Sequence, residues 1–73
     1  MIYIYGEKYS TYTGWGGLRQ LGSSNSLVAA RRFARDYSRK LAITGNIDYH
    51  FEYHDEGGKC VEVDWASDLL KGR

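Results

Sequence analysis

The sequence predicts an α+β fold: a small antiparallel β-sheet with one long α-helix packed on one face. Apolar residues recur at helical spacing within residues 24–43, and apolar and polar residues alternate on both sides of the glycine-containing turn Asp55–Gly58. The expected order is strand, loop or short strand, helix, strand, strand. A chain of 73 residues suits a single domain spanning residues 1–73.

The N-terminal segment Met1–Tyr5 alternates β-branched and aromatic residues, which is typical of a strand. Its isoleucines would lie on one face and its tyrosines on the other, and the strand could continue to Tyr9 or Tyr12. Residues 10–26 are rich in glycine and serine, which interrupt any regular pattern. We expect a loop tucked onto the core, an irregular turn of helix, or a second strand across Gly17–Leu21.

The helix within residues 24–43 has signals at both ends and one apolar stripe. Asn25 or Ser26 can accept hydrogen bonds from the first backbone N–H groups, and Gly45 suits the left-handed position after the last turn. The stripe consists of Ala30, Phe33, Ala34, Tyr37 and Leu41. Ser38 and the arginines fall outside it, so we expect the stripe to face the sheet.

The hairpin pattern predicts which strand residues reach the core. The side chains expected to meet the helix are those of Ile47, Tyr49, Phe51, Tyr53, Val61, Val63 and Trp65. The polar side would then carry Asp48, His50, Glu52, His54, Cys60, Glu62 and Asp64. A final helical turn is expected over Asp68–Lys71.

Composition limits the classes of protein to which this chain could belong. A single cysteine, Cys60, excludes internal disulfides and favours a reducing cytoplasm. The N-terminus lacks the basic region and apolar stretch of a secretory signal, and no apolar run approaches the ~20 residues of a membrane span. Because a chain this short buries only about 60% of its unfolded surface, a homodimer or a large partner would help to stabilise it.

The net charge of +1 conceals a strong segregation of charge along the chain. Residues 1–45 contain seven Lys or Arg and two acids, whereas residues 46–73 contain three Lys or Arg and seven acids. Segregated charge steers partners together and opposes wrong ones. The pattern therefore indicates binding.

The basic side of the helix is the first candidate contact surface. It carries Arg31, Arg32, Arg35 and Arg39. Their fork-shaped donors suit the phosphates of a nucleic acid or the carboxylates of a partner protein. The alternatives are a solvated helix face, or pairing with the protein's own acids in the hairpin.

Two further groups are candidates for partner contact. Glu52, Glu62 and Asp64 could imitate a phosphate backbone in a basic groove, or form the ordinary polar outer face of a sheet. An aromatic contact patch with Arg19 beside it could be formed by Tyr3, Tyr5, Tyr9, Tyr12 and Trp15. The alternative is that about half of these rings close the core, and Trp15 is expected to be exposed. We favour the arginine side with Trp15 and Tyr12 beside it, because Arg, Trp and Tyr are enriched at interface hot spots.

The sequence predicts no catalytic residues, no cofactor and no metal site. It has no nucleophile elbow, phosphate loop or metal-binding helix motif. His50 and His54 would lie roughly 13 Å apart on an ideal strand, too far to bind one ion. A site would need His54 with Cys60, or His50 with Glu62, together with further ligands.

In size and layout the chain resembles the small phage-encoded anti-CRISPR proteins that inhibit type I systems. The likeness rests on the strand Met1–Tyr5, the Ala-Ala-Arg-Arg-Phe-Ala-Arg helix of Ala29–Arg35, and the hairpin Ile47–Trp65 closed by Glu-Gly-Gly-Lys. The resemblance implies a stoichiometric inhibitor that binds a bacterial CRISPR effector complex by surface contacts, without assigning any residue. A net charge near zero argues against a whole-molecule DNA mimic. The alternative function is direct nucleic-acid binding through the arginine helix.

Overall fold

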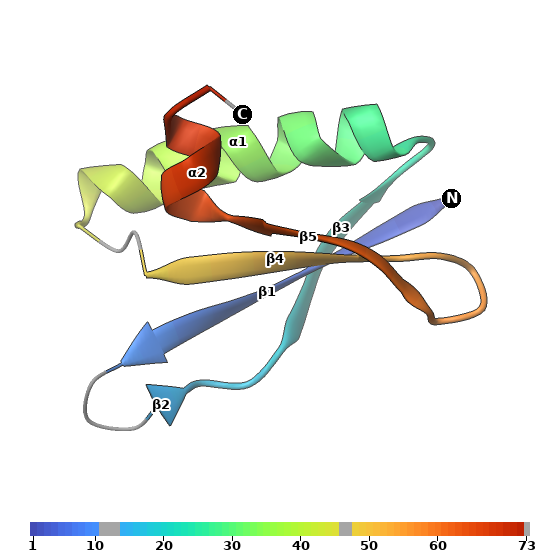
Figure 1. Cartoon of the computed structure of the whole chain (residues 1–73), viewed down its shortest axis with the longest axis horizontal. Coiled ribbons are helices and arrows are strands. Elements are labelled where there is room, and N and C mark those ends of the chain that lie inside the picture. The colour runs from blue at the N-terminus through green and yellow to red at the C-terminus, as the bar shows by residue number, and fades with distance from the viewer. Residues whose placement is uncertain (11–13, 46–47, 73) are drawn as a thin grey trace.

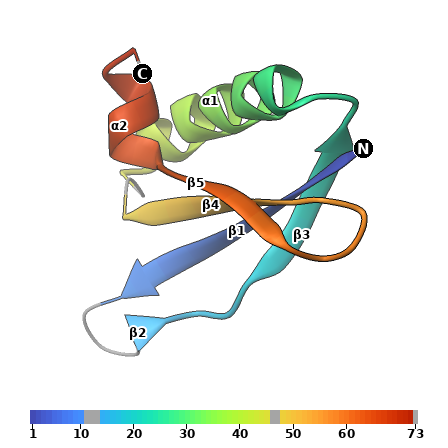
Figure 2. The ribbon, with the colours of Figure 1, turned by 45° about the vertical axis from the view of Figure 1, so that its right-hand side comes forward.

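The computed structural model describes residues 1–10, 14–45 and 48–72, and it confirms the predicted α+β class. Its elements are β1 (Ile2–Ser10), β2 (Gly14–Trp15), β3 (Arg19–Ser24), α1 (Leu27–Ile43), β4 (Tyr49–His54), β5 (Cys60–Trp65) and α2 (Ala66–Leu70). Both helices lie on one side of the sheet, and no described element covers the other side (Figure 1, Figure 2). Tyr12 and Ile47 lie outside the described residues.

Strand β1 organises the sheet because it pairs along both edges. On one edge it pairs antiparallel with β4, which in turn pairs with β5. Along the other edge it pairs first with β3 and then with β2. The glycine-rich segment therefore contains strands β2 and β3, and the strand expected across Gly17–Leu21 as one of the alternatives runs instead over Arg19–Ser24.

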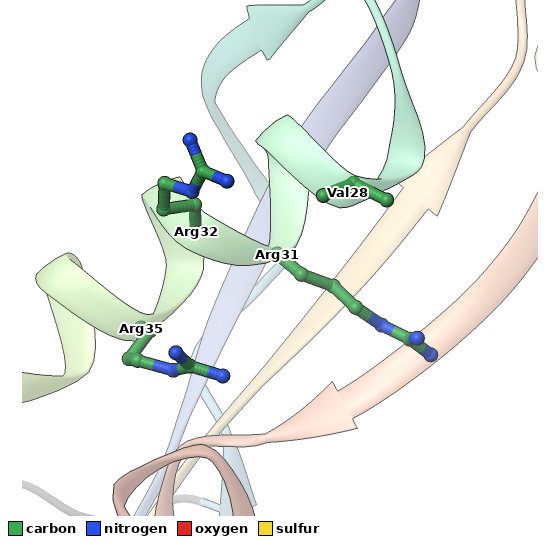
Figure 3. A pocket seen from close by; sticks show the side chains of 4 residues that line it. All are labelled: Val28, Arg31, Arg32 and Arg35. Atoms are coloured by element: carbon green, nitrogen blue, oxygen red, sulfur yellow. The ribbon is translucent and has the colours of Figure 1, made fainter. Parts of the chain in front are cut away.

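Helix α1 begins and ends where the local sequence predicts. The Ser26 hydroxyl accepts a hydrogen bond from the backbone N–H of Ala29 at 3.2 Å, which satisfies one of the donors of the first turn. At the other end, Gly45 takes a φ of 80°, the left-handed conformation that terminates the helix. Arg31 points from α1 toward β5, whereas Arg32 turns outward into solvent (Figure 3).

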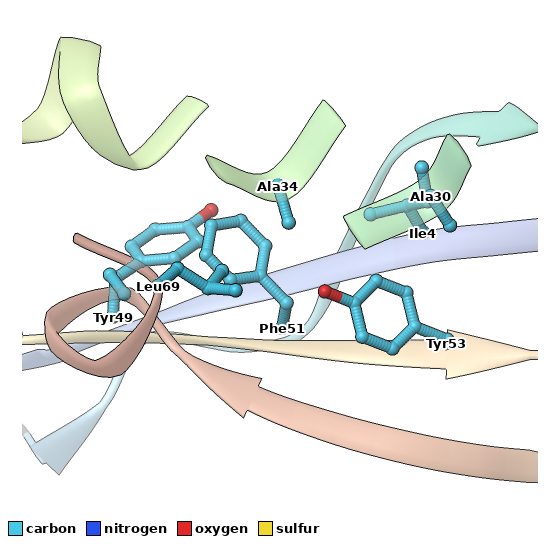
Figure 4. Close-up of a cluster of buried hydrophobic side chains, with 8 residues drawn as sticks. Ile4, Ala30, Ala34, Tyr49, Phe51, Tyr53 and Leu69 are labelled. Atoms are coloured by element: carbon cyan, nitrogen blue, oxygen red, sulfur yellow. The ribbon is translucent and has the colours of Figure 1, made fainter. Parts of the chain in front are cut away.

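The core lies between the sheet and the two helices (Figure 4). Its buried side chains are Ile4, Ala30, Ala34, Tyr49, Phe51, Tyr53, Ala66 and Leu69. The small alanines of α1 let the aromatic residues of β4 fill the space beneath the helix. Ser38, predicted to lie outside the buried stripe, is fully buried, and its hydroxyl donates to the Ala34 carbonyl at 2.7 Å. The buried hydroxyl therefore has a hydrogen-bond partner within the helix.

One prediction for the hairpin is wrong: within β5, the side chains from Glu62 to Trp65 point to the faces opposite to those predicted, whereas Cys60 lies on the uncovered side as expected. Directly opposed residues of an antiparallel pair lie on the same face, and Glu62 is opposite the buried Tyr53. Asp64, two residues on, shares the helix side with Glu62. Val63 and Trp65 therefore lie on the uncovered side of the sheet, where they are 43% and 45% exposed.

A β-bulge accompanies this reversal. Tyr53 pairs with Glu62 but His54 pairs with Cys60, so Val61 is an extra residue without an opposite partner. Val61 is exposed and does not join the core, contrary to the prediction. A shift of one residue moves a side chain to the other face of a sheet, and the pattern of the strand alone does not reveal it.

Candidate functional site

Arg31 and Arg39 of the helix bind acids of this chain. Arg31 Nη2 lies 3.2 Å from Glu62 Oε2, and Arg31 Nε donates to Asp64 Oδ2 at 3.0 Å. Arg39 pairs with Asp36, one turn earlier, at 3.3 Å. Pairing with the protein's own acids, one of the alternatives left open by the sequence, therefore holds for Arg31.

Part of the basic surface of α1 borders a shallow hollow of about 290 Å³ (Figure 3). The hollow is lined by Val28, Arg31, Arg32 and Arg35. Arg32 is exposed and Arg35 is half-buried. This part of the helix has the chemistry to receive a phosphate or a carboxylate.

The three acids predicted to share one face are divided between the two faces of the sheet. Glu62 and Asp64 lie on the helix side, where Asp64 Oδ2 also accepts from the Tyr53 hydroxyl at 2.9 Å. Burial, and then the hydrogen bond to Asp64, raises the pKa of the Tyr53 hydroxyl above its usual value. Glu52 lies on the uncovered side, opposite Val63. The hairpin therefore does not present these acids as one row resembling a phosphate backbone.

The uncovered side of the sheet carries a cluster of rings contributed by β1, β2, β4 and β5. The ring centroid of Trp15 lies 5.2 Å from that of Tyr9, 4.6 Å from that of His50 and 5.7 Å from that of Trp65. We call these four residues the aromatic patch. Trp15 is exposed, as predicted, but its predicted place beside the arginine helix is wrong, because α1 packs on the other side of the sheet.

Two histidines share one carboxylate next to the aromatic patch. His50 Nε2 lies 3.2 Å from Glu52 Oε2, and His54 Nε2 lies 3.0 Å from Glu52 Oε1. Both side chains lean toward the glutamate between them, so the strand spacing overstates their separation. The hydrogen bond with His54 lowers the pKa of the Glu52 carboxyl; partial burial opposes this shift, and the bond with His50 reinforces it. Glu7 places a further carboxylate 4.0 Å from His50.

Arg19 lies on the helix side of the sheet, at the β3 edge. A second hollow, of about 360 Å³, is lined by Lys8, Gly16, Gly17, Arg19, Tyr37 and Tyr49. Burial, followed by the neighbouring Tyr37, raises the pKa of Tyr49 to about 12, while the charge of Arg19 opposes the shift. Arg19 and Trp15 therefore do not form the single patch that was predicted, and Tyr12 lies outside the described residues.

Two of the four residues of the aromatic patch, Tyr9 and Trp15, belong to the contact patch predicted from the sequence, whereas His50 and Trp65 do not. The alternation of β1, with Ile4 buried, places Tyr9 on the uncovered side, and His50 falls between the buried Tyr49 and Phe51. The alternation of apolar and polar residues in β1 and β4 is enough to predict the faces of Tyr9 and His50. The face of Trp65 could not be predicted in this way, because it depends on the bulge in β5.

Comparisons with known proteins give no assignment, since no family model, no curated protein and no solved structure matches the chain. Within residues 1–10, 14–45 and 48–72, no helix is both long enough and apolar enough to cross a membrane. We therefore infer the function from the surfaces themselves.

Proposed function

We propose that this protein is a small, non-enzymatic binding protein that docks onto a partner protein through the aromatic patch. The supporting observation is that Tyr9, Trp15 and Trp65 are all exposed together on the uncovered side of the sheet. Soluble proteins rarely leave a contiguous apolar surface open without a use for it. Tyr and Trp are also the residues that contribute most to the affinity of protein interfaces.

The rings of the aromatic patch are held in place before any partner arrives. Trp15 contacts a ring on each of three other strands, and those strands belong to one hydrogen-bonded sheet. Side chains that are already ordered lose little conformational entropy on binding. The patch is therefore a rigid platform suited to an apolar anchor on the partner.

The charges beside the patch specify the chemistry of the partner. Glu7 and Glu52 lie around His50, which contacts both carboxylates and the Trp15 ring. Phosphates placed over this face would be repelled by the two carboxylates, so a nucleic acid is disfavoured here. A protein surface with an apolar centre and Lys or Arg at its rim would be complementary.

The finer form of this proposal is a phage-encoded inhibitor of anti-CRISPR type. It would bind a bacterial CRISPR effector complex in the host cytoplasm and block nucleic-acid recognition or cleavage. The resemblance in size and layout supports an inhibitor of this type. A CRISPR effector complex handles nucleic acid in a basic groove, and Lys or Arg at the edge of such a groove would complement Glu7 and Glu52. A stoichiometric blocker needs no enclosed catalytic pocket.

A pull-down from bacterial lysate that contains CRISPR effector complexes tests the proposal. The parent should retain a stable partner, and the double variant Trp15→Ala, Trp65→Ala should bind at least about 30-fold more weakly, as expected for hot-spot residues. Ile43→Ala is the matched control, because it removes an exposed apolar side chain from α1 on the other side of the molecule. Absence of any partner at low and moderate salt, or parental binding by the double variant, would contradict the proposal.

The hollow on α1 supports a second candidate function, direct binding of nucleic acid through Arg32 and its neighbours. Such binding should weaken linearly on a plot of log K against log salt, with a slope set by the phosphates contacted. The double variant Arg32→Glu, Arg39→Glu should abolish it, while the tryptophan variant should leave it intact. Gel shifts without retardation of single- or double-stranded DNA or RNA at low salt would exclude this candidate.

A further inference from the structure

Three side chains with metal-binding chemistry converge on the uncovered side of the sheet, near the end of the β4–β5 hairpin. A carboxylate oxygen of Glu52, a ring nitrogen of His54 and the Cys60 sulfur all lie within 4.8 Å of one another. His54 and Glu52 are two residues apart on β4, and Cys60 is directly opposite His54 on β5. The cluster thus offers one oxygen, one nitrogen and one sulfur ligand from two hydrogen-bonded strands.

The bulge in β5 brings the cysteine to this cluster. Cys60 and Glu62 are two residues apart and would share a face in a regular strand. Here Glu62 is opposite Tyr53 on the helix side, whereas Cys60 is opposite His54 on the uncovered side, because Val61 is inserted between them. Bulges often serve to redirect a side chain at a functional site.

The separations fit a zinc ion after a small adjustment. Tetrahedral zinc with the usual Zn–N, Zn–O and Zn–S bond lengths holds its ligand atoms roughly 3.4–3.6 Å apart. His54 Nε2 and Glu52 Oε1 are 3.0 Å apart and must separate by about 0.4 Å, and the sulfur, which lies within 4.8 Å of the other ligand atoms, must approach them by at most about 1.3 Å. Cys60 is exposed and its thiol makes a weak 3.5 Å contact with the Glu62 carbonyl, so rotation of its side chain is inexpensive.

Neighbouring groups already orient two of the three ligands. His50 Nε2 contacts the other oxygen of Glu52 at 3.2 Å, which leaves Oε1 turned toward His54. The Tyr5 ring lies against the His54 imidazole, with the ring centroids 4.5 Å apart. Such supporting contacts hold ligands in position and strengthen metal binding.

We propose that Glu52, His54 and Cys60 bind one Zn²⁺ ion, with water in the fourth position. Thiolate and imidazole ligands select zinc over the hard cations Mg²⁺ and Ca²⁺. The bound ion would clamp β4 to β5 at the end of the hairpin. Glu52 belongs both to this site and to the charged surroundings of the aromatic patch, but the metal can be tested without the proposed partner, because the ion is added to the isolated chain.

The test is a titration of the reduced full-length protein with Co²⁺, followed by displacement with Zn²⁺. Binding should show thiolate-to-cobalt charge-transfer absorption at a stoichiometry of one ion per chain. Cys60→Ser and His54→Asn should each weaken binding by more than about 100-fold. Glu52→Gln should weaken it too, whereas Glu62→Gln should bind as the parent, since Glu62 is only two residues from Cys60 in sequence but lies on the other face of the sheet.

A second measurement uses only the parent protein, so it does not depend on the folding of any variant. Excess Zn²⁺ should slow alkylation of Cys60 by a maleimide at least about 10-fold, in line with the occupancy of a thiolate ligand. Absence of protection, or equal metal affinity in the parent and in His54→Asn, would overturn the proposal. Binding that needs Cys60 but neither His54 nor Glu52 would also overturn it, because it would reflect an isolated thiol.

Discussion

Replacing Asp64 with alanine should lower the free energy of unfolding by about 2–3 kcal/mol, although the strand alternation marks Asp64 as a surface residue. Its side chain is 13% exposed and accepts hydrogen bonds from the Tyr53 hydroxyl at 2.9 Å and from Arg31 Nε at 3.0 Å. The substitution leaves the Tyr53 hydroxyl buried without its partner, which costs about 1–3 kcal/mol. The lost contact with Arg31 adds up to about 1 kcal/mol, because Arg31 is partly exposed and keeps Glu62.

Two control variants make the Asp64 measurement specific. Glu62→Ala removes a contact with the same arginine, but at a side chain that is 43% exposed, and should cost no more than about 1 kcal/mol. Val63→Lys places a charge on the uncovered side of the sheet and should also cost less than about 1 kcal/mol. Urea unfolding at pH 7, followed by tryptophan fluorescence and far-ultraviolet circular dichroism, measures all three.

A double-mutant cycle isolates the hydrogen bond between Asp64 and Tyr53. In a Tyr53→Phe background no hydroxyl is left unsatisfied, so Asp64→Ala should cost about 1 kcal/mol less than in the parent. The β4–β5 register would be refuted if Asp64→Ala kept the parent's free energy of unfolding while Val63→Lys lowered it by 2 kcal/mol or more. The side chains of β5 would then have the faces that simple alternation predicts.

Three further predictions concern the core, the helix cap and the behaviour at high pH. Phe51→Ala should cost about 3–5 kcal/mol in urea unfolding, because the ring is fully buried between sheet and helix; a loss below 1 kcal/mol would contradict the core. Ser26→Ala should cost about 1 kcal/mol in thermal unfolding, through loss of the cap to Ala29, with Ser26→Asn close to the parent. The pKa of Tyr49 rises from 10.0 to about 12 on folding, so the unfolded chain loses this proton first and stability falls by about 1–2 kcal/mol between pH 10 and 12. The Tyr49→Phe variant cannot ionise at this position, so its free energy of unfolding should fall less steeply between pH 10 and 12. The same slope as in the parent would contradict the raised pKa of Tyr49.

The predictions that rested on local physics were confirmed by the structure. Ser26 caps the helix and Gly45 ends it, because capping depends on side chains and backbone angles within a few residues. The β1 isoleucines and the aromatic residues of β4 face the helices, because period-two alternation reports one buried face directly. A strand among the glycines was one of three alternatives, since its pairing with β1 is not a local property.

The contact surfaces were harder to predict because they combine elements that are distant in sequence. Trp15 was correctly expected to be exposed, but its neighbours Tyr9, His50 and Trp65 come from three other strands. The arginine side of α1 was identified from its spacing. Its pairing through Arg31 with acids of β5 required the register of the hairpin.

The sequence by itself therefore determined the class of fold, the span of the helix, and the separation of basic and acidic residues between the two parts of the chain. Only the tertiary structure decided which face of the sheet each charge and each ring of β5 occupies. The physical reason is the extra residue Val61. Alternation along a strand implies only that neighbouring side chains lie on opposite faces, whereas pairing with the next strand and a one-residue bulge decide which side chains face the helices. That selection sends Asp64 toward the helix, Trp65 to the aromatic patch and Cys60 to the cluster with Glu52 and His54.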